Sequence, residues 1–226
     1  MGIPVLIEGE SGSGKSRSLK NFKPGEISVF NVAGKPLPFR TAIATVSVNK
    51  LAEKNNVTRY VAIKTAMKKS KAKAFAIDDS QYLMAFDSFD KANEKGYEKF
   101  TNMAVNFEKL IEFIINDLAD DVIVYFLHHV ELADNGKYKA KTIGKMLDNQ
   151  LTLEGLFSIV LFCTADENHH CFITQSKGIS TAKSPEEMFP EEIENDLKAV
   201  DTAIREYWGL APNEFEPNDT ESEENK

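Results

Sequence analysis

The sequence has few of the residues that staple secreted domains, and it lacks the long apolar runs that span membranes. Only two of its 226 residues are cysteine, Cys163 and Cys171, which argues against a disulfide scaffold and for a reducing compartment. No apolar run approaches the roughly 18–20 residues of a membrane-spanning helix. The N-terminus has no basic segment followed by an apolar stretch, so no secretory signal is expected. These absences predict a cytoplasmic protein with no membrane contact.

Positive charge is outnumbered along the chain. The net charge at pH 7 is −8, and residues 212–226 alone carry six acidic side chains and one lysine. Because this segment is almost without apolar residues, we expect a disordered acidic tail after one domain formed by residues 1–211. Such a tail serves solubility, competes with nucleic acid for a basic surface, or docks a partner. Hydrophobic residues make up 42% of the chain, so the domain can build a full core.

A phosphate-binding motif lies near the start of the chain. The pattern G-x-x-x-x-G-K-[ST] is matched by Gly9-Glu10-Ser11-Gly12-Ser13-Gly14-Lys15-Ser16. Its glycines let successive backbone N–H groups turn onto a phosphate, while Lys15 approaches the β- and γ-phosphates and Ser16 offers a hydroxyl to Mg²⁺. Arg17, the next residue, is included among the expected contacts. The motif therefore predicts a bound nucleoside triphosphate, ATP, with Mg²⁺.

The flanking segments suit this motif. The apolar run Ile3–Ile7 is typical of a buried strand and ends just before the loop. Residues 16–22 favour a short helix, which Pro24-Gly25 would end. The positive end of that helix would face the anion. Strand, loop and helix thus follow one another in the order that phosphate binding requires.

A second apolar run ends in two carboxylates, at Ala74-Phe75-Ala76-Ile77-Asp78-Asp79. Buried parallel strands are apolar throughout, and ligands bind at their carboxyl ends. We therefore expect Asp78 to bind Mg²⁺, directly or through water. Asp79 is the candidate to orient or deprotonate the attacking water, and Glu10 inside the loop is the alternative.

A third apolar run, residues 122–127, ends in His128-His129. We expect this strand to lie beside the one that ends at Asp78, with His128 or His129 contacting the γ-phosphate as a sensor. The alternative is a histidine pair that merely ends a strand. Residues 135–145 hold four lysines and no acid, which predicts a flexible basic loop. It would contact a phosphate backbone or a neighbouring subunit's nucleotide, unless it is an ordinary solvated loop.

Strands and helices alternate along the rest of the chain. Further strands are expected at 27–32, 156–162 and 171–174, and helices at 57–70, 98–118, near 143–153 and at 191–208. Residues 41–56 fit no single pattern. The alternation predicts an α/β fold with a mainly parallel central sheet and helices on both faces.

A possible metal motif occurs in the second half of the chain. Cys163, His169, His170 and Cys171 have the spacing Cys-x₅-His-His-Cys, which matches no common structural zinc site. The spacing therefore predicts no metal site.

Taken together, these motifs resemble the phage-encoded AAA/RecA-like P-loop ATPases of recombination and replication gene clusters. The resemblance rests on the loop 9–16, on 74–79 followed by Ser80-Gln81-Tyr82, on 125–131, and on Thr181-Ala182-Lys183-Ser184-Pro185. It covers roughly residues 1–210. It implies a three-layer RecA-like core, ATP hydrolysis, a homo-oligomer in the host cytoplasm, and a role with single-stranded DNA beside an annealing or single-stranded-DNA-binding protein.

The resemblance also assigns roles by position. Lys15 and Ser16 would take phosphate and Mg²⁺, Asp78 would take Mg²⁺, and His128 or His129 would sense the γ-phosphate. RecA-type enzymes usually place a catalytic glutamate after the strand that follows the loop helix. Here that strand is followed by Ala33-Gly34-Lys35, so Asp79 is the substitute.

Three functions are compatible with these motifs. The leading one is an ATPase acting on single-stranded DNA, and the second is a nucleotide-dependent assembly factor that binds proteins without touching DNA. The third, a small-molecule P-loop kinase, would need an arginine-rich lid over the phosphates. The chain has only four scattered arginines, at positions 17, 40, 59 and 205, so the kinase ranks last.

Overall fold

The computed structural model describes residues 1–94, 96, 98–143, 152–167 and 169–214. The expected acidic tail from residue 215 onward, and most of the helix expected near 143–153, lie outside these residues. Asn213, inside the range expected as tail, is buried and donates through Nδ2 to the carbonyl of Glu26 at 3.0 Å.

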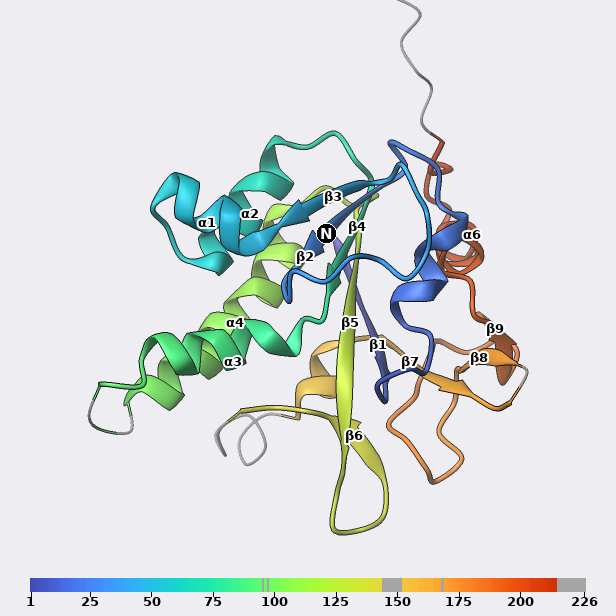
Figure 1. The fold of residues 1–226 in the computed structure, drawn as a ribbon. Coiled ribbons are helices and arrows are strands. Elements are labelled where there is room, and N and C mark those ends of the chain that lie inside the picture. The colour runs from blue at the N-terminus through green and yellow to red at the C-terminus, as the bar shows by residue number, and fades with distance from the viewer. Residues whose placement is uncertain (95, 97, 144–151, 168, 215–226) are drawn as a thin grey trace, which may run out of the picture.

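The described residues form one central sheet with helices on both faces (Figure 1). Its strands are β1 (Ile3–Gly9), β2 (Ile27–Asn31), β3 (Ala44–Ser47), β4 (Ala74–Asp78), β5 (Ile123–Leu132), β6 (Tyr138–Ala140), β7 (Ile159–Ala165), β8 (His170–Ile173) and β9 (Glu192–Glu194). The helices are η1 (Ser16–Asn21), α1 (Val48–Asn55), α2 (Arg59–Lys69), α3 (Gln81–Asp90), α4 (Glu98–Asp117), η2 (Leu153–Leu156) and α6 (Leu197–Trp208).

The sheet is mainly parallel, as the sequence predicts. Strands β3-β2-β4-β5-β1-β7 run parallel in that spatial order, while β8 and β9 extend the β7 edge in antiparallel fashion and β6 pairs antiparallel with the end of β5. The loop-bearing strand β1 therefore lies in the middle of the sheet. Strand β5 lies between β1 and β4, so it is the neighbour of both, as expected for the histidine-bearing strand.

Two cores cover the two faces of the sheet. Alternate residues of each central strand point to opposite sides, so Leu6 and Phe126 join the core beneath α1 to α4, whereas Ile7 and Tyr125 join the core beneath η1 and α6. This double covering explains why the stretches 5–7 and 123–127 of the central strands are continuously hydrophobic rather than alternating.

Two of the expected helices are confirmed. Helices α2 and α4 lie within a few residues of the predicted 57–70 and 98–118, and Met103, Phe107 and Leu110 of the α4 apolar stripe are fully buried. The helical pattern over 57–70 places Val61 on the inward side, but Val61 is 45% exposed, and Ala62 and Ile63 form the buried side of α2 instead.

The predicted helix over 191–208 is wrong in its first turn and a half. Residues 192–194 form the edge strand β9, and the helix begins only after Asp196, whose side chain accepts hydrogen bonds from the backbone N–H groups of Lys198 and Ala199. This N-cap is the stronger start signal. The predicted end is confirmed, since Gly209 caps α6 with a left-handed φ of 64°.

Other segments differ from the sequence predictions. The ambiguous residues 41–56 hold β3 and α1, the unpredicted helix α3 follows Ser80, and a short strand, β6, occupies part of the basic loop. Strand β5 does not end at the histidines but continues through them to Leu132.

Helix η1, which follows the loop, is a six-residue 3-10 helix. A helix this short adds little macrodipole, so any anion at the loop depends on loop N–H groups and side chains.

Candidate nucleotide site

The carboxyl ends of the central parallel strands gather the predicted residues at one edge of the sheet. The register pairs Gly9 of β1 with His129 of β5, and Asn31 of β2 with Asp78 of β4. The loop that follows β1 therefore lies beside the acidic end of β4, with β5 between them. Parallel strands commonly bind ligands at this edge.

A cavity of about 330 Å³ opens at this edge. Its walls bring together residues that the motifs predicted, namely Ser11, Gly12, Gly14, Lys15, Ser16, Arg17, Asp78, Asp79 and His129. Four further residues complete it: Lys35, Pro36, Pro38 and His170. The expected sites from three separate parts of the sequence thus share one hollow.

The loop backbone takes conformations that need glycine. Gly12 and Gly14 have φ values of +84° and +107°, and a Cβ on Gly14 would lie 2.8 Å from Nδ1 of His170. A Cβ on Gly9 would lie 2.5 Å from the carbonyl oxygen of Cys163. Within the described part of the chain, the hydrogen bonds leave the N–H groups of Gly12, Gly14 and Lys15 without an acceptor. The loop can therefore offer several donors to one anion.

The ammonium group of Lys15 folds back onto the loop. Its Nζ donates to the carbonyl oxygens of Gly9 at 2.8 Å and Glu10 at 2.7 Å. Burial lowers the pKa of Lys15, and the nearby carboxylates of Asp79 and Asp78 oppose that shift. The lysine is thus held inside the site by neutral acceptors.

Ser16 and Asp78 meet across the cavity. The hydroxyl of Ser16 donates to Oδ1 of Asp78 at 2.7 Å, joining residues 62 positions apart. Burial raises the pKa of Asp78, while the hydrogen bond from Ser16 lowers it. A hydroxyl beside a carboxylate is a pair of hard oxygen ligands of the kind that Mg²⁺ prefers.

Asp79 is held by two cationic or potentially cationic side chains. Its Oδ2 pairs with Nζ of Lys35 at 2.7 Å, and its Oδ1 lies 3.2 Å from Nε2 of His129. Burial raises the pKa of Asp79, but the hydrogen bonds from His129 and Lys35 prevail and bring it below its usual value. A carboxylate with a lowered pKa is a weak proton acceptor, which favours orienting water over deprotonating it.

The two neighbouring histidines occupy different environments. His129 lines the cavity, whereas His128 is fully buried beneath it, with Nδ1 2.8 Å from Oγ of Ser80 and Nε2 2.8 Å from the carbonyl of Lys141. Burial lowers the pKa of His128 to about 4. Of the two expected sensors, only His129 is placed to meet a ligand.

Glu10 and Ser13 are loop residues outside the cavity lining. Glu10 is exposed and lies beside Tyr138, whose phenol pKa its charge raises. Ser13 is buried, and its carbonyl receives Sγ of Cys163 at 3.2 Å and lies 2.9 Å from Nδ1 of His170. Glu10 is therefore poorly placed as the alternative base.

Lys35 and His170 are the site residues that the motifs missed. Lys35 follows β2 just as Asp79 follows β4, so the rule that ligands bind at the carboxyl ends of parallel strands could have found it. His170 reaches the loop from β8, an edge strand far along the chain. We find no sequence signal for that contact.

The described part of the basic loop, residues 135–143, includes strand β6, which forms a β-hairpin with the end of β5. Lys139 pairs with Glu131 at 3.2 Å, and the ring of Tyr138 stacks on Phe162 with centroids 5.4 Å apart. Lys137 and Lys141 are exposed. The hairpin thus presents lysines to solvent while its aromatic side chain is used in packing.

Comparison with protein-family models and with curated proteins finds no match for the chain. Among the described residues, none of the helices combines the length and the apolar character needed to cross a membrane.

Proposed function

We propose that the protein binds a Mg²⁺-nucleoside triphosphate, ATP, and hydrolyses it as a RecA-like P-loop ATPase that acts with single-stranded DNA in phage recombination or replication. The observation that supports this most is the hydrogen bond between Ser16 and Asp78 in the cavity that Lys15 and the glycine loop also line. A chance match to a short motif would not bring its hydroxyl onto a buried acid from another strand.

The hydrogen-bond donors and oxygen ligands of the cavity suit a triphosphate with bound Mg²⁺. The free N–H groups of the loop and the ammonium of Lys15 would take the β- and γ-phosphates. Ser16 and Asp78 would hold Mg²⁺, which supplies neutralisation of the phosphate charge when bound. On binding, Lys15 exchanges two neutral carbonyls for anionic oxygens, and such charge-assisted hydrogen bonds are roughly twice as strong as neutral ones.

Hydrolysis needs an oriented water and positive charge more than covalent chemistry. Asp79, kept ionised by its partners, orients the water. Lys35 lies beside Asp79 in the same cavity and adds a positive charge from this chain itself. His129 contacts Asp79 and is the group that would respond to loss of the γ-phosphate.

The hairpin supplies a physical route between nucleotide and DNA. The backbone N–H of Lys141 donates to the carbonyl of His129 at 2.8 Å, and the carbonyl of Lys141 contacts His128. Exposed lysines on this hairpin would bind phosphates of a DNA strand. Movement of His129 with the nucleotide would therefore reach the hairpin.

The test is the rate of ATP hydrolysis by the full chain at low salt, with and without single-stranded DNA. We expect DNA to raise turnover, added salt to remove that effect, and Lys15→Ala to lower turnover by about 100-fold or more. Lys71→Ala removes an exposed lysine at the opposite end of β4 and serves as the matched control with unchanged turnover.

Other outcomes separate the alternative functions. Nucleotide binding with turnover that ignores DNA would favour the assembly factor. Accumulation of a phosphorylated small molecule would favour the kinase. Failure of the wild-type chain to bind any nucleoside triphosphate in the presence of Mg²⁺ would overturn the whole proposal.

A further inference from the structure

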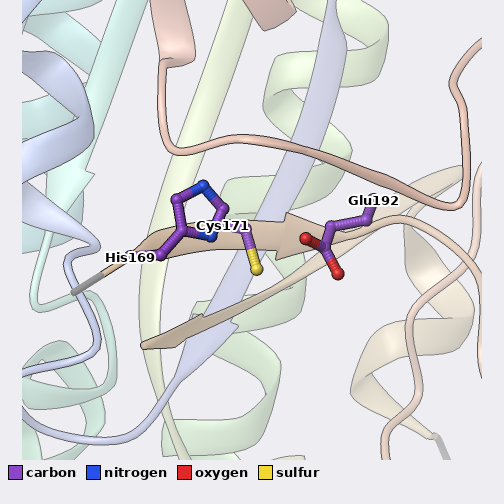
Figure 2. A group of neighbouring side chains, drawn as sticks. All are labelled: His169, Cys171 and Glu192. Atoms are coloured by element: carbon purple, nitrogen blue, oxygen red, sulfur yellow. The ribbon is translucent and has the colours of Figure 1, made fainter. Parts of the chain in front are cut away.

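A second cluster of side chains that could bind a metal lies on the edge strands β8 and β9, on the face that points away from the hydrophobic core. Figure 2 shows His169, Cys171 and Glu192 gathered there. One potential ligand atom from each lies within 4.8 Å of the others. We propose that these three residues form a site for a transition metal ion of the zinc class.

The strand register explains how the cluster forms. Cys171 pairs with Glu194 and Ile173 pairs with Glu192 in the antiparallel β8–β9 ladder. Because side chains alternate along a strand, the residues at positions 169 and 171 share one face with those at 192 and 194. Phe172 and Ile193 take the other face, where they join the hydrophobic core.

This placement revises the metal motif read from the sequence. Cys163 and His170 do not belong to the cluster, since both contact the carbonyl of Ser13 on the opposite side. Glu192 joins instead, from a segment that the sequence assigned to a helix. The spacing Cys-x₅-His-His-Cys matches no common zinc site, but this does not argue against a metal bound by His169, Cys171 and Glu192.

The donor types select the class of metal. A thiolate with an imidazole suits Zn²⁺ and its relatives, whereas Mg²⁺ and Ca²⁺ prefer oxygen alone. Three protein ligands leave a fourth position to water, as in open zinc sites. Tetrahedral zinc with bonds of about 2.0–2.3 Å places its ligand atoms roughly 3.5 Å apart, so side-chain movements of about 1 Å would close the cluster.

Glu194 orients the imidazole ring of His169. Nε2 of His169 lies 3.2 Å from Oε1 of Glu194, which leaves Nδ1 for a metal. A carboxylate on the second ring nitrogen is the usual way in which a metal-binding histidine is oriented. Metal binding replaces the thiol proton of Cys171, which passes to solvent, because the thiolate is the ligand.

A metal here would act on the nucleotide cavity only indirectly. It would fasten β8 to β9. On the opposite face, His170 of β8 contacts the carbonyl of Ser13 in the loop, and Asn195, just after β9, donates through Nδ2 to Sγ of Cys163 at 3.2 Å, which itself contacts that carbonyl. The inference needs no nucleotide, so it stands or falls independently of the proposed function.

The experiment titrates Co²⁺ into the full chain after removal of metals with a chelator. We expect one equivalent to bind with thiolate-to-cobalt charge-transfer absorption, and Zn²⁺ to displace it. Cys171→Ala should abolish the band, and Cys163→Ala, which removes the other thiol, should retain it. Glu192→Gln changes an exposed side chain and should weaken binding at least 10-fold, while Glu194→Gln should weaken it about 10–100-fold.

Circular dichroism spectra of each variant serve to check that it is folded. The proposal is overturned if the wild-type chain shows no charge-transfer band, if Cys163→Ala rather than Cys171→Ala removes it, or if Glu192→Gln binds Co²⁺ as tightly as the wild type.

Discussion

Asp79 concentrates both backbone strain and charge. It is one of three non-glycine residues with positive φ among the described residues, at +60°, and its carboxylate is clamped between Lys35 and His129. Such a conformation costs of order 1 kcal/mol or more and persists only where the surroundings enforce it. Strain next to Asp78, at the edge of the cavity, fits a carboxylate held ready to position a water.

Lys35 offers the sharpest test at this scale. Its hydrogen bond with Asp79 raises the pKa of Lys35, so it is charged throughout the physiological range. We expect Lys35→Ala to lower ATP turnover about 10-fold or more, because the site loses a positive charge near the phosphates. The free energy of unfolding should change by less than about 1 kcal/mol, since Lys35 is largely exposed.

Steady-state kinetics and urea unfolding measure the two effects. Lys35→Arg keeps the charge and should recover part of the turnover, while Lys71→Ala controls for loss of a lysine elsewhere. Equal turnover in Lys35→Ala and wild type would remove Lys35 from the mechanism. A loss of several kcal/mol in stability would make it a structural residue instead.

At the scale of elements, the sequence predicted those whose pattern is unbroken. The apolar runs at 3–7 and 74–78 predicted the buried strands β1 and β4, and the helical pattern over 98–118 predicted α4. Prediction failed where pairing with a distant strand, rather than the local sequence, determines the secondary structure. Residues 192–194 are too short a segment for a strand pattern to be recognised, and they form β9 by pairing with β8 at the edge of the sheet. Ala44–Ser47 likewise forms β3 by pairing with β2 at the other edge.

The candidate site, like the fold, was predictable from the sequence only in part. Its loop and Asp78 follow from local motifs, so their positions could be named in advance. Lys35 could have been proposed from its place after β2, but its ion pair with Asp79 depends on how the loop after β2 folds. The contact of His170 with the loop depends on how the edge strands fold over the cavity. Sequence spacing carries no record of that, and the same is true of the cluster at His169, Cys171 and Glu192.

Helix α6 illustrates how one element is fixed to the sheet by charge. Arg205 and Asp201 are both buried and pair at 2.7 Å, and Asp201 also accepts from the hydroxyl of Tyr125 on β5 at 2.9 Å. Arg205 further donates to the carbonyls of Asp121 and Lys73. This network joins α6 to the end of the sheet opposite the cavity lined by Lys15 and Asp78.

Breaking this buried network should lower the stability of the protein strongly. We expect Arg205→Met to lower the free energy of unfolding by about 3–5 kcal/mol, because Asp201 is left as an unpaired buried charge. The double variant Arg205→Met with Asp201→Leu removes both charges and should recover part of the loss. Urea unfolding followed by circular dichroism gives both values, and a cost below about 1 kcal/mol would contradict the network's importance.

For the molecule as a whole, the central strands bury two ionisable side chains with opposite consequences for stability. Glu8 of β1 and His128 of β5 are register partners and both are fully buried. Burial raises the pKa of Glu8 to about 7, with Glu154 adding to this and the hydroxyl of Thr181 opposing it. Burial lowers the pKa of His128 to about 4, and the neighbouring charges of His129 and Lys15 act in the same direction.

These shifts make opposite contributions to the pH dependence of unfolding. For Glu8, the folded state holds more protons than the unfolded state from its ordinary pKa of 4.5 up to about 7, so the stability it contributes falls as pH rises. For His128, the unfolded state holds more protons between about 4 and the ordinary 6.5, so that contribution rises with pH. Each amounts to about 3 kcal/mol at 1.36 kcal/mol per pH unit, and they nearly cancel between pH 4.5 and 6.5.

Removing either group should therefore expose the other. We expect the stability of Glu8→Gln to climb by about 3 kcal/mol relative to wild type between pH 4.5 and 6.5, because only the histidine contribution remains. His128→Asn should show a relative decline of similar size over the same interval. Differences from wild type, taken from urea unfolding at each pH, remove the contributions of Asp78 and Asp79, which all three proteins share. Stability curves for both variants that run parallel to that of the wild type would mean that neither side chain changes its proton affinity on folding, and the neutral buried pair at the centre of the sheet would have to be abandoned.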